Sequence, residues 1–201
     1  RGTIGIPRVL NMYEDYPFWF TLFTNLGFRV ILSEKSDRKT YEKGMESMPS
    51  ESVCYPAKLV HGHIQSLINK GIQTIFYPSV FYERLEDKNA GHHFNCPVVA
   101  SYPETIKNNV EDLEKVNFIQ PYLSMNKKET MANVLTEALS SYQISKKEIE
   151  KAIDLGFEEL HHFKEDVINE GLKTLQYMKE NKTIAAFGGV NSASSRCHYI
   201  D

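Results

Sequence analysis

Short apolar runs that alternate with helical patterns constrain the fold more than any other feature of this sequence. Five segments have the composition of buried strands: "TIGI", "FRVILS", "IQTIFY", "CPVVASY" and "VNFIQPY". Between them lie helical patterns, one ending at Gly27, one starting at Ser36 or Asp37, and one from Pro56 to Lys70. Strands that alternate with helices over short loops predict an α/β fold, with a parallel sheet and helices on both faces.

The chain changes character after Pro121. The region from Met125 to Glu180 has little strand signal, and "SKKE" at 145–148 matches a capping box. Its apolar stripe is interrupted by glycines, so we expect two helices that pack on the sheet or on a partner domain. "KTIAAFGG" then predicts another strand. The expected organisation is an α/β domain over residues 1–124, a helical segment over 125–182, and the start of a following domain over 183–201.

Composition excludes several classes of protein. A chain of 201 residues with 41% hydrophobic content can bury a sizeable core. The formal charge of -3 and the interspersed acidic and basic residues argue against nucleic acid as a partner. The sequence has neither a signal-peptide pattern nor an apolar run of the roughly 20 residues that span a bilayer. We therefore predict a cytoplasmic protein that does not bind membranes.

The stretch "PSESVCYPAKLVHGH" contains Cys54, the strongest single candidate for a functional cysteine. Cys54 is expected at the start of a helix, where free N–H groups and the helix dipole favour an anion. A thiolate there could bind metal or attack an electrophile, whereas a small buried cysteine is an equally good interpretation. Three cysteines, widely spaced and odd in number, do not indicate a disulfide framework. Reduced thiols or metal ligands are expected instead.

The remaining candidates are weaker when taken alone. Cys96 is expected at the start of a strand, where packing is the simpler role. His61 and His63 are two residues apart on a helix, so they face different sides and cannot bind one metal together. His92 and His93 are expected to be solvated, as are the histidines at 161 and 162. The sequence contains no standard zinc spacing, dinucleotide fingerprint or P-loop.

Four segments taken together resemble a known family: "GIPRVLNMYEDYPFWFTLFTNLGFRVILS", "YEKGMESMPSESVCYPAKLVHGHI", "IFYPSVFYE" and "FNCPVVASYPETIKNN". They are similar to the domain that follows the ATPase modules in large activators of 2-hydroxyacyl-CoA dehydratases, the CoA-substrate-specific enzyme activase family. That domain is in turn similar to the dehydratase subunits and to double-cubane cluster proteins. The resemblance covers residues 4 to about 109.

The resemblance implies a Rossmann-like domain from an anaerobic bacterium. Better-known members of the group hold a 4Fe-4S cluster between α/β domains. That cluster accepts one electron from an ATP-driven reductase and passes it to a CoA thioester or a similar substrate. The implied partners are other domains of the same protein and a dehydratase or reductase component, and a homodimer is compatible with this group. The ATPase motifs are absent here, so no nucleotide hydrolysis is expected from this chain.

The resemblance also bears on individual residues. Cys54 matches the first cluster cysteine of the family, and Cys96 belongs to the same pattern, so these two are the expected cluster and metal ligands. Ser79 stands where the family often has cysteine, and serine is a poor iron ligand beside thiolate. A further ligand in the better-known members comes from a later domain. Cys197 has no partner that the sequence indicates.

Three functions remain open at this point. The first is an iron–sulfur or redox module, incomplete in isolation. The second is a docking domain of the same fold that has lost the cluster, which Ser79 supports. A thiol hydrolase that uses Cys54 with His61 or His63 is disfavoured, because the sequence shows no acid to orient either histidine.

Overall fold

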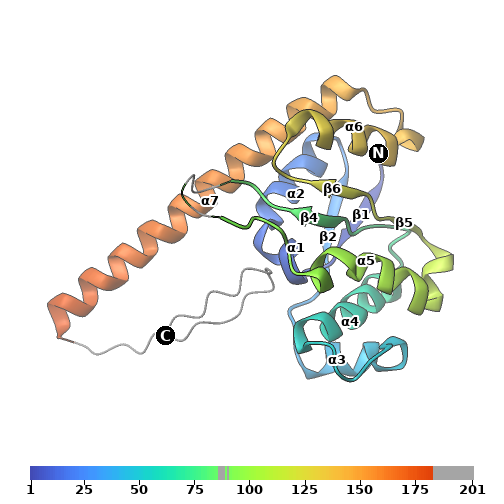
Figure 1. The fold of residues 1–201 in the computed structure, drawn as a ribbon, viewed down its shortest axis with the longest axis horizontal. Coiled ribbons are helices and arrows are strands. Elements are labelled where there is room, and N and C mark those ends of the chain that lie inside the picture. Colours follow the sequence, from blue (N-terminus) through green and yellow to red (C-terminus); the bar gives the residue numbers. More distant parts are fainter. Residues whose placement is uncertain (86–88, 90, 183–201) are drawn as a thin grey trace.

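A parallel sheet forms the centre of the protein, as expected from the alternating pattern (Figure 1). The structure is a computed structural model that describes residues 1–85, 89 and 91–182. The main sheet has the strand order β2-β1-β3-β5, and all of its neighbours pair in parallel. A second parallel pair joins β4 to β6. The strands are β1 (Thr3–Ile6), β2 (Arg29–Leu32), β3 (Thr74–Phe76), β4 (Ser79–Tyr82), β5 (Asn117–Ile119) and β6 (Tyr122–Ser124).

Helices flank this sheet, which confirms the predicted fold class. One group contains α2, α6 and α7, and another contains α3, α4 and α5 (Figure 1). The helices are α1 (Leu10–Glu14), α2 (Tyr16–Asn25), α3 (Arg38–Gly44), α4 (Tyr55–Asn69), α5 (Pro97–Asn109), α6 (Lys128–Ala138) and α7 (Lys146–Asn181). Three 3-10 turns join them: η1 (Met45–Ser47), η2 (Glu111–Lys115) and η3 (Ser140–Tyr142). Within the described residues, no helix combines the length and apolar character needed to cross a membrane.

Aromatic side chains of α2 fill the core beside the sheet. Phe18, Trp19 and Phe23 are fully buried, and the rings of Trp19 and Phe23 lie 5.0 and 4.7 Å from that of Phe76 on β3. Gly27 ends the turn after α2 with a φ of 81°, a conformation that glycine adopts without a steric penalty. The chain therefore turns directly into β2. That strand is only partly buried, contrary to expectation, because it lies at the edge of the sheet.

The segment from Pro97 to Pro103 is helical, and the strand predicted over "CPVVASY" is wrong. It forms α5, which begins at Pro97 and contains Pro103. Val99, Tyr102 and Ile106 are buried at helical spacing, so the buried face of this helix has period 3.6 rather than 2. Cys96 accordingly occupies the N-cap of a helix instead of the start of a strand.

Two other elements differ from the sequence prediction. The third strand stops at Phe76, and the chain forms the separate strand β4 from Ser79 onward. The helical region begins with α6, and residues 146–181 then form the single helix α7, in which Gly156 and Gly171 are interior. The predicted capping box at its start is present, since Ser145 and Glu148 bond each other's backbone N–H groups. The strand and following domain predicted over 183–201, and Cys197, lie outside the described residues.

Candidate functional site

The two candidate cysteines cap neighbouring helices. Cys54 is the N-cap of α4 and Cys96 is the N-cap of α5, and a proline occupies the first turn of each helix. Because α4 leads into β3 and α5 leads toward β5, both helices run back across a parallel sheet. Their N-termini therefore lie toward the carboxyl edge of the strands, where α/β proteins collect ligands. The two helices also pack against each other.

Both thiols are available for chemistry at these helix starts. Cys54 is exposed and Cys96 is partly buried, and both are free cysteines. Neither side chain makes a capping hydrogen bond to its helix. The backbone carbonyl of Cys54 accepts from the N–H groups of Ala57 and Lys58 at 3.1 and 3.2 Å, so the helix is already regular at this point. A negatively charged group at either cap is favoured by the helix dipole.

Ser79 is close in sequence to the carboxyl end of β3, at the same edge of the sheet. It follows the carboxyl end of β3 by three residues and begins β4. Its backbone N–H donates to the carbonyl of Pro121 at 2.9 Å, and its side chain is buried. The Ser79 hydroxyl therefore lies in the second sheet rather than on an exposed loop.

Two thiols do not make a complete iron–sulfur site. In the part of the chain that the structure describes, no three His, Cys, Asp or Glu side chains come together in a way that could hold a metal. A 4Fe-4S cluster normally takes four cysteine thiolates, so Cys54 and Cys96 suit the chemistry but supply half of the usual number. The residues thus fit a shared site better than a self-contained one.

A buried hydrogen-bond chain runs between α4 and α5. The Nδ1 atom of His61 lies 2.8 Å from the Ser47 hydroxyl, and its Nε2 atom lies 3.1 Å from the Tyr102 hydroxyl. The Ser47 hydroxyl donates to the carbonyl of Gly44 at 3.1 Å, so it accepts from Nδ1–H of His61. Nε2 of His61 then accepts from Tyr102. Burial lowers the pKa of His61 to about 4, and the ring is neutral at pH 7.

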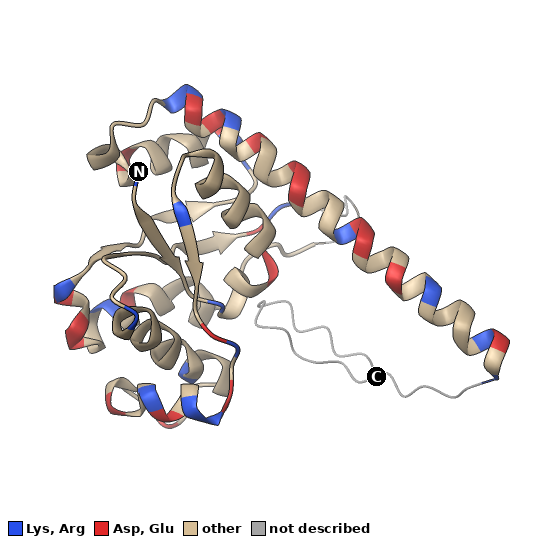
Figure 2. Cartoon of the chain, turned by 180° about the vertical axis from the view of Figure 1, so that it is seen from behind, with Lys and Arg blue, Asp and Glu red and all other residues tan. Residues whose placement is uncertain are grey.

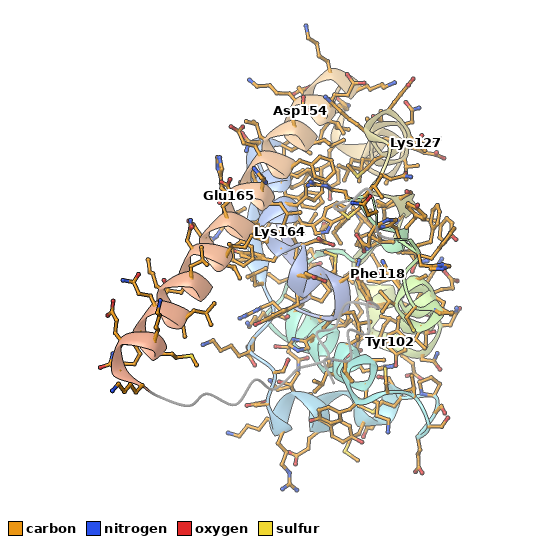
Figure 3. The ribbon with its side chains drawn as sticks, turned by 60° about the vertical axis from the view of Figure 1, so that its left-hand side comes forward. Tyr102, Phe118, Lys127, Asp154, Lys164 and Glu165 are labelled. Carbon is orange, nitrogen blue, oxygen red and sulfur yellow. The ribbon has the colours of Figure 1, made fainter. Side chains whose placement is uncertain are left out.

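Two tyrosines at or near this chain of hydrogen bonds have raised pKa values. Burial, with a smaller electrostatic effect of the nearby Cys54, raises the pKa of Tyr102 to about 12 (Figure 3). Burial and the proximity of Tyr102 raise the pKa of Tyr77. The Tyr77 hydroxyl has no hydrogen-bond partner among the described residues. Tyr102 was not anticipated as a site residue because its segment was interpreted as a strand, although the spacing of Val99, Tyr102 and Ile106 is that of a helix.

His63 faces the opposite side of α4 from His61, as the sequence predicted. Its Nδ1 and Nε2 atoms lie 2.8 and 2.9 Å from the hydroxyls of Ser33 and Ser36. Burial, with a smaller effect of the Arg8 charge, lowers the pKa of His63 to about 4. Each histidine is thus held by its own hydroxyl pair, and neither ring has a nitrogen bonded to Cys54. The arrangement does not support a thiol hydrolase.

The other histidines follow the sequence prediction in part. His161 and His162 are exposed on α7, and His92 is exposed. His93, which was expected to be solvated, is buried. It lies beside Tyr82, with ring centroids 5.9 Å apart, where the chain pairs back onto β4 through a bridge between Tyr82 and Phe94. Tertiary pairing, and not the polarity of the loop, decides its burial.

Comparison with known proteins identifies the family. No curated protein and no solved structure matches the chain significantly. A family model described as "CoA enzyme activase uncharacterised domain (DUF2229)" matches residues 3–190, which include both candidate cysteines and both sheets and all seven α-helices of the described residues. The match extends well beyond residues 4–109, the region whose sequence suggested the resemblance. The chain therefore belongs to the CoA enzyme activase uncharacterised domain family.

Proposed function

We propose that this domain is an iron–sulfur module of an activator of 2-hydroxyacyl-CoA dehydratases, and that Cys54 and Cys96 are its cluster ligands. The observation that carries this proposal is the placement of two free cysteines at the N-caps of the packed helices α4 and α5. Membership of the activase family supports the biological context. When bound, a 4Fe-4S cluster would supply one-electron chemistry at low potential.

The helix starts would stabilise such a group electrostatically. A thiolate-ligated cluster is anionic, and the N-termini of α4 and α5 present backbone N–H groups whose partial positive charge favours an anion. Hydrogen bonds to the sulfur atoms also tune the potential of a cluster. The role of this chain is therefore to bind and orient part of the cluster.

The remaining ligands must come from elsewhere under this proposal, because the described residues contain two thiols at this edge. Other domains of the same protein and a partner dehydratase component are the proposed sources. A cluster shared between domains would move electrons only when those domains are assembled. The proposed site therefore lies at an interface between this domain and the domain or subunit that supplies the other ligands.

Anaerobic reconstitution of the chain with iron, sulfide and an excess of a small thiol tests the proposal, because the small thiol can occupy the iron positions that this chain leaves without a ligand. We expect iron and sulfide to bind, with an EPR signal after reduction, and we expect Cys54→Ala to abolish the binding and Cys96→Ala to weaken it. Cys197→Ala is the matched control and should retain iron. Equal iron content in the wild type and in both the Cys54→Ala and Cys96→Ala variants would contradict the assignment.

A docking domain that has lost its cluster is the second candidate. Ser79 in place of the cysteine that the family often has favours it. Ser79→Cys separates the two candidates: if this variant binds iron stably and the native chain binds none, a former cluster site has become a docking domain. Iron binding by the native chain that Ser79→Cys leaves unchanged would speak for the first candidate.

A further inference from the structure

The outer half of α7 carries exposed apolar side chains that no described element covers. The inner half packs on α2 and α6 and buries Ile149, Ile153 and Leu160. Beyond Leu160 the helix projects away from the body (Figure 1). Its large apolar side chains there are exposed by 44–62%: Phe163, Val167, Ile168, Leu172, Leu175 and Tyr177. They lie on two sides of the helix: Ile168, Leu172 and Leu175 lie on one side, and Phe163, Val167 and Tyr177 lie on the opposite side.

The pattern along this helix half is that of a helix–helix seam. Ile168 and Leu175 are seven residues apart, and Leu172 lies between them at intervals of four and three. Positions with this spacing form one stripe on an α-helix and typically bury against a second helix.

Charges are placed at the two ends of the same stripe. Glu165 lies seven residues before Leu172, and Lys179 lies seven residues after it. Seven residues are nearly two helical turns, so all three share one side of α7. Figure 3 shows Glu165 where α7 leaves the body, whereas Lys179 lies in the last turn. The stripe therefore has an acidic end near the body and a basic end at the tip.

We propose that this face of α7 pairs antiparallel with the same face of a second copy of the chain. In that arrangement the Glu165 end of one copy meets the Lys179 end of the other, twice by symmetry. A parallel pair would instead place Glu165 against Glu165 and Lys179 against Lys179. Charge complementarity thus selects one orientation and one occupant.

The dimensions of the chain also favour this arrangement. Leu172 is the middle of the exposed segment 163–181, which is about 27 Å long at the usual helical rise. An antiparallel pair centred near Leu172 therefore ends each helix where the other copy's body begins. The two bodies lie at opposite ends of the pair, so the seam can close along its full length without their meeting.

Sedimentation velocity of the 201-residue chain over a wide concentration range tests the proposal. We expect a monomer–dimer equilibrium for the wild type. Leu172→Glu should remain monomeric at every concentration, because it places carboxylates in the centre of the seam. Far-UV circular dichroism and the thermal transition should show that this variant keeps the folded body. A wild type that stays monomeric throughout, or a Leu172→Glu variant that dimerises equally well, would overturn the proposal.

Charge exchange tests the orientation. Glu165→Lys and Lys179→Glu should each weaken dimerisation at least severalfold, since each brings like charges together. The double variant should recover affinity close to that of the wild type. Glu159→Lys is the matched control, because Glu159 is exposed on the inner half of α7 and lies on a different side of the helix from Glu165 and Lys179. Absence of recovery in the double variant would refute antiparallel pairing, and the outcome does not depend on whether the chain binds iron.

Discussion

His61 and His63 make the stability of the protein sensitive to acid. Both rings are buried, and both pKa values lie near 4, below the ordinary value of about 6.5. The unfolded chain therefore binds more protons than the folded chain between pH 6.5 and 4. Stability is full above pH 6.5 and falls as the pH drops through that window, with a slope on the order of 1.4 kcal/mol per pH unit for each ring.

Urea unfolding at pH 7 and pH 5 measures this effect. We expect a clearly lower midpoint at pH 5. His162→Gln is the matched control, since His162 is exposed on α7, and it should leave the pH dependence unchanged. A midpoint that is the same at both pH values would show that neither buried ring resists protonation.

Cys54 illustrates what one residue can and cannot contribute. Its position at a helix start was anticipated from Pro56 and the apolar spacing that follows, whereas its exposure was not, because a buried cysteine was an equally good interpretation. Cys96 was assigned to the wrong element, because "CPVV" is a short run that includes β-branched valines. Its N-cap position becomes evident only when the buried face of Val99, Tyr102 and Ile106 is known.

At the scale of elements, α3 and α4 approach each other closely through glycine. A Cβ atom on Gly62 would lie 1.7 Å from the backbone oxygen of Thr40, and one on Gly44 would lie 2.4 Å from the backbone nitrogen of Gly62. Neither neighbour can move without displacing a helix. The contact places Ser47 beside His61 and so holds the hydrogen-bond chain from Ser47 through His61 to Tyr102.

Gly62→Ala should destabilise the protein by about 3 kcal/mol, because the added methyl group forces α3 away from α4. The measurement is the free energy of unfolding from urea titration. Gly171→Ala is the control: this glycine is also inside a helix but has open space around it, so alanine should leave stability unchanged or raise it by up to about 1 kcal/mol. Similar losses in both variants would mean that helix propensity matters more than the contact.

At the scale of the whole molecule, the protein is a packed body with one projecting helix. Acidic and basic residues alternate along α7 (Figure 2). Its outer half projects beyond α2 and α6, the helices on which its inner half packs. Isolated helices of this length are marginal in water, and most helical stability in proteins comes from tertiary packing. The two halves of α7 should therefore differ in stability.

Hydrogen exchange followed by mass spectrometry tests this difference. Amides of residues 149–160 should exchange only with global unfolding, whereas those of 163–181 should exchange much faster in dilute protein. Protection of the outer half should increase as the concentration rises and copies pair. Equal protection of both halves in dilute protein would contradict this expectation, and α4 provides an internal reference for the packed body.

The sequence alone determined the parallel α/β class, the helix starts at Asp37, Cys54 and Ser145, and the family. These depend on hydrophobic periodicity, on helix-capping residues and on sequence similarity, all of which can be recognised without the tertiary structure. Tertiary structure decided what depends on contacts between distant segments. It made "CPVVASY" a helix, divided the strands between two sheets, joined His61 to Tyr102, and left one face of α7 without a described neighbour. Short apolar runs suit both helix and strand, so only the surface that they bury distinguishes the two.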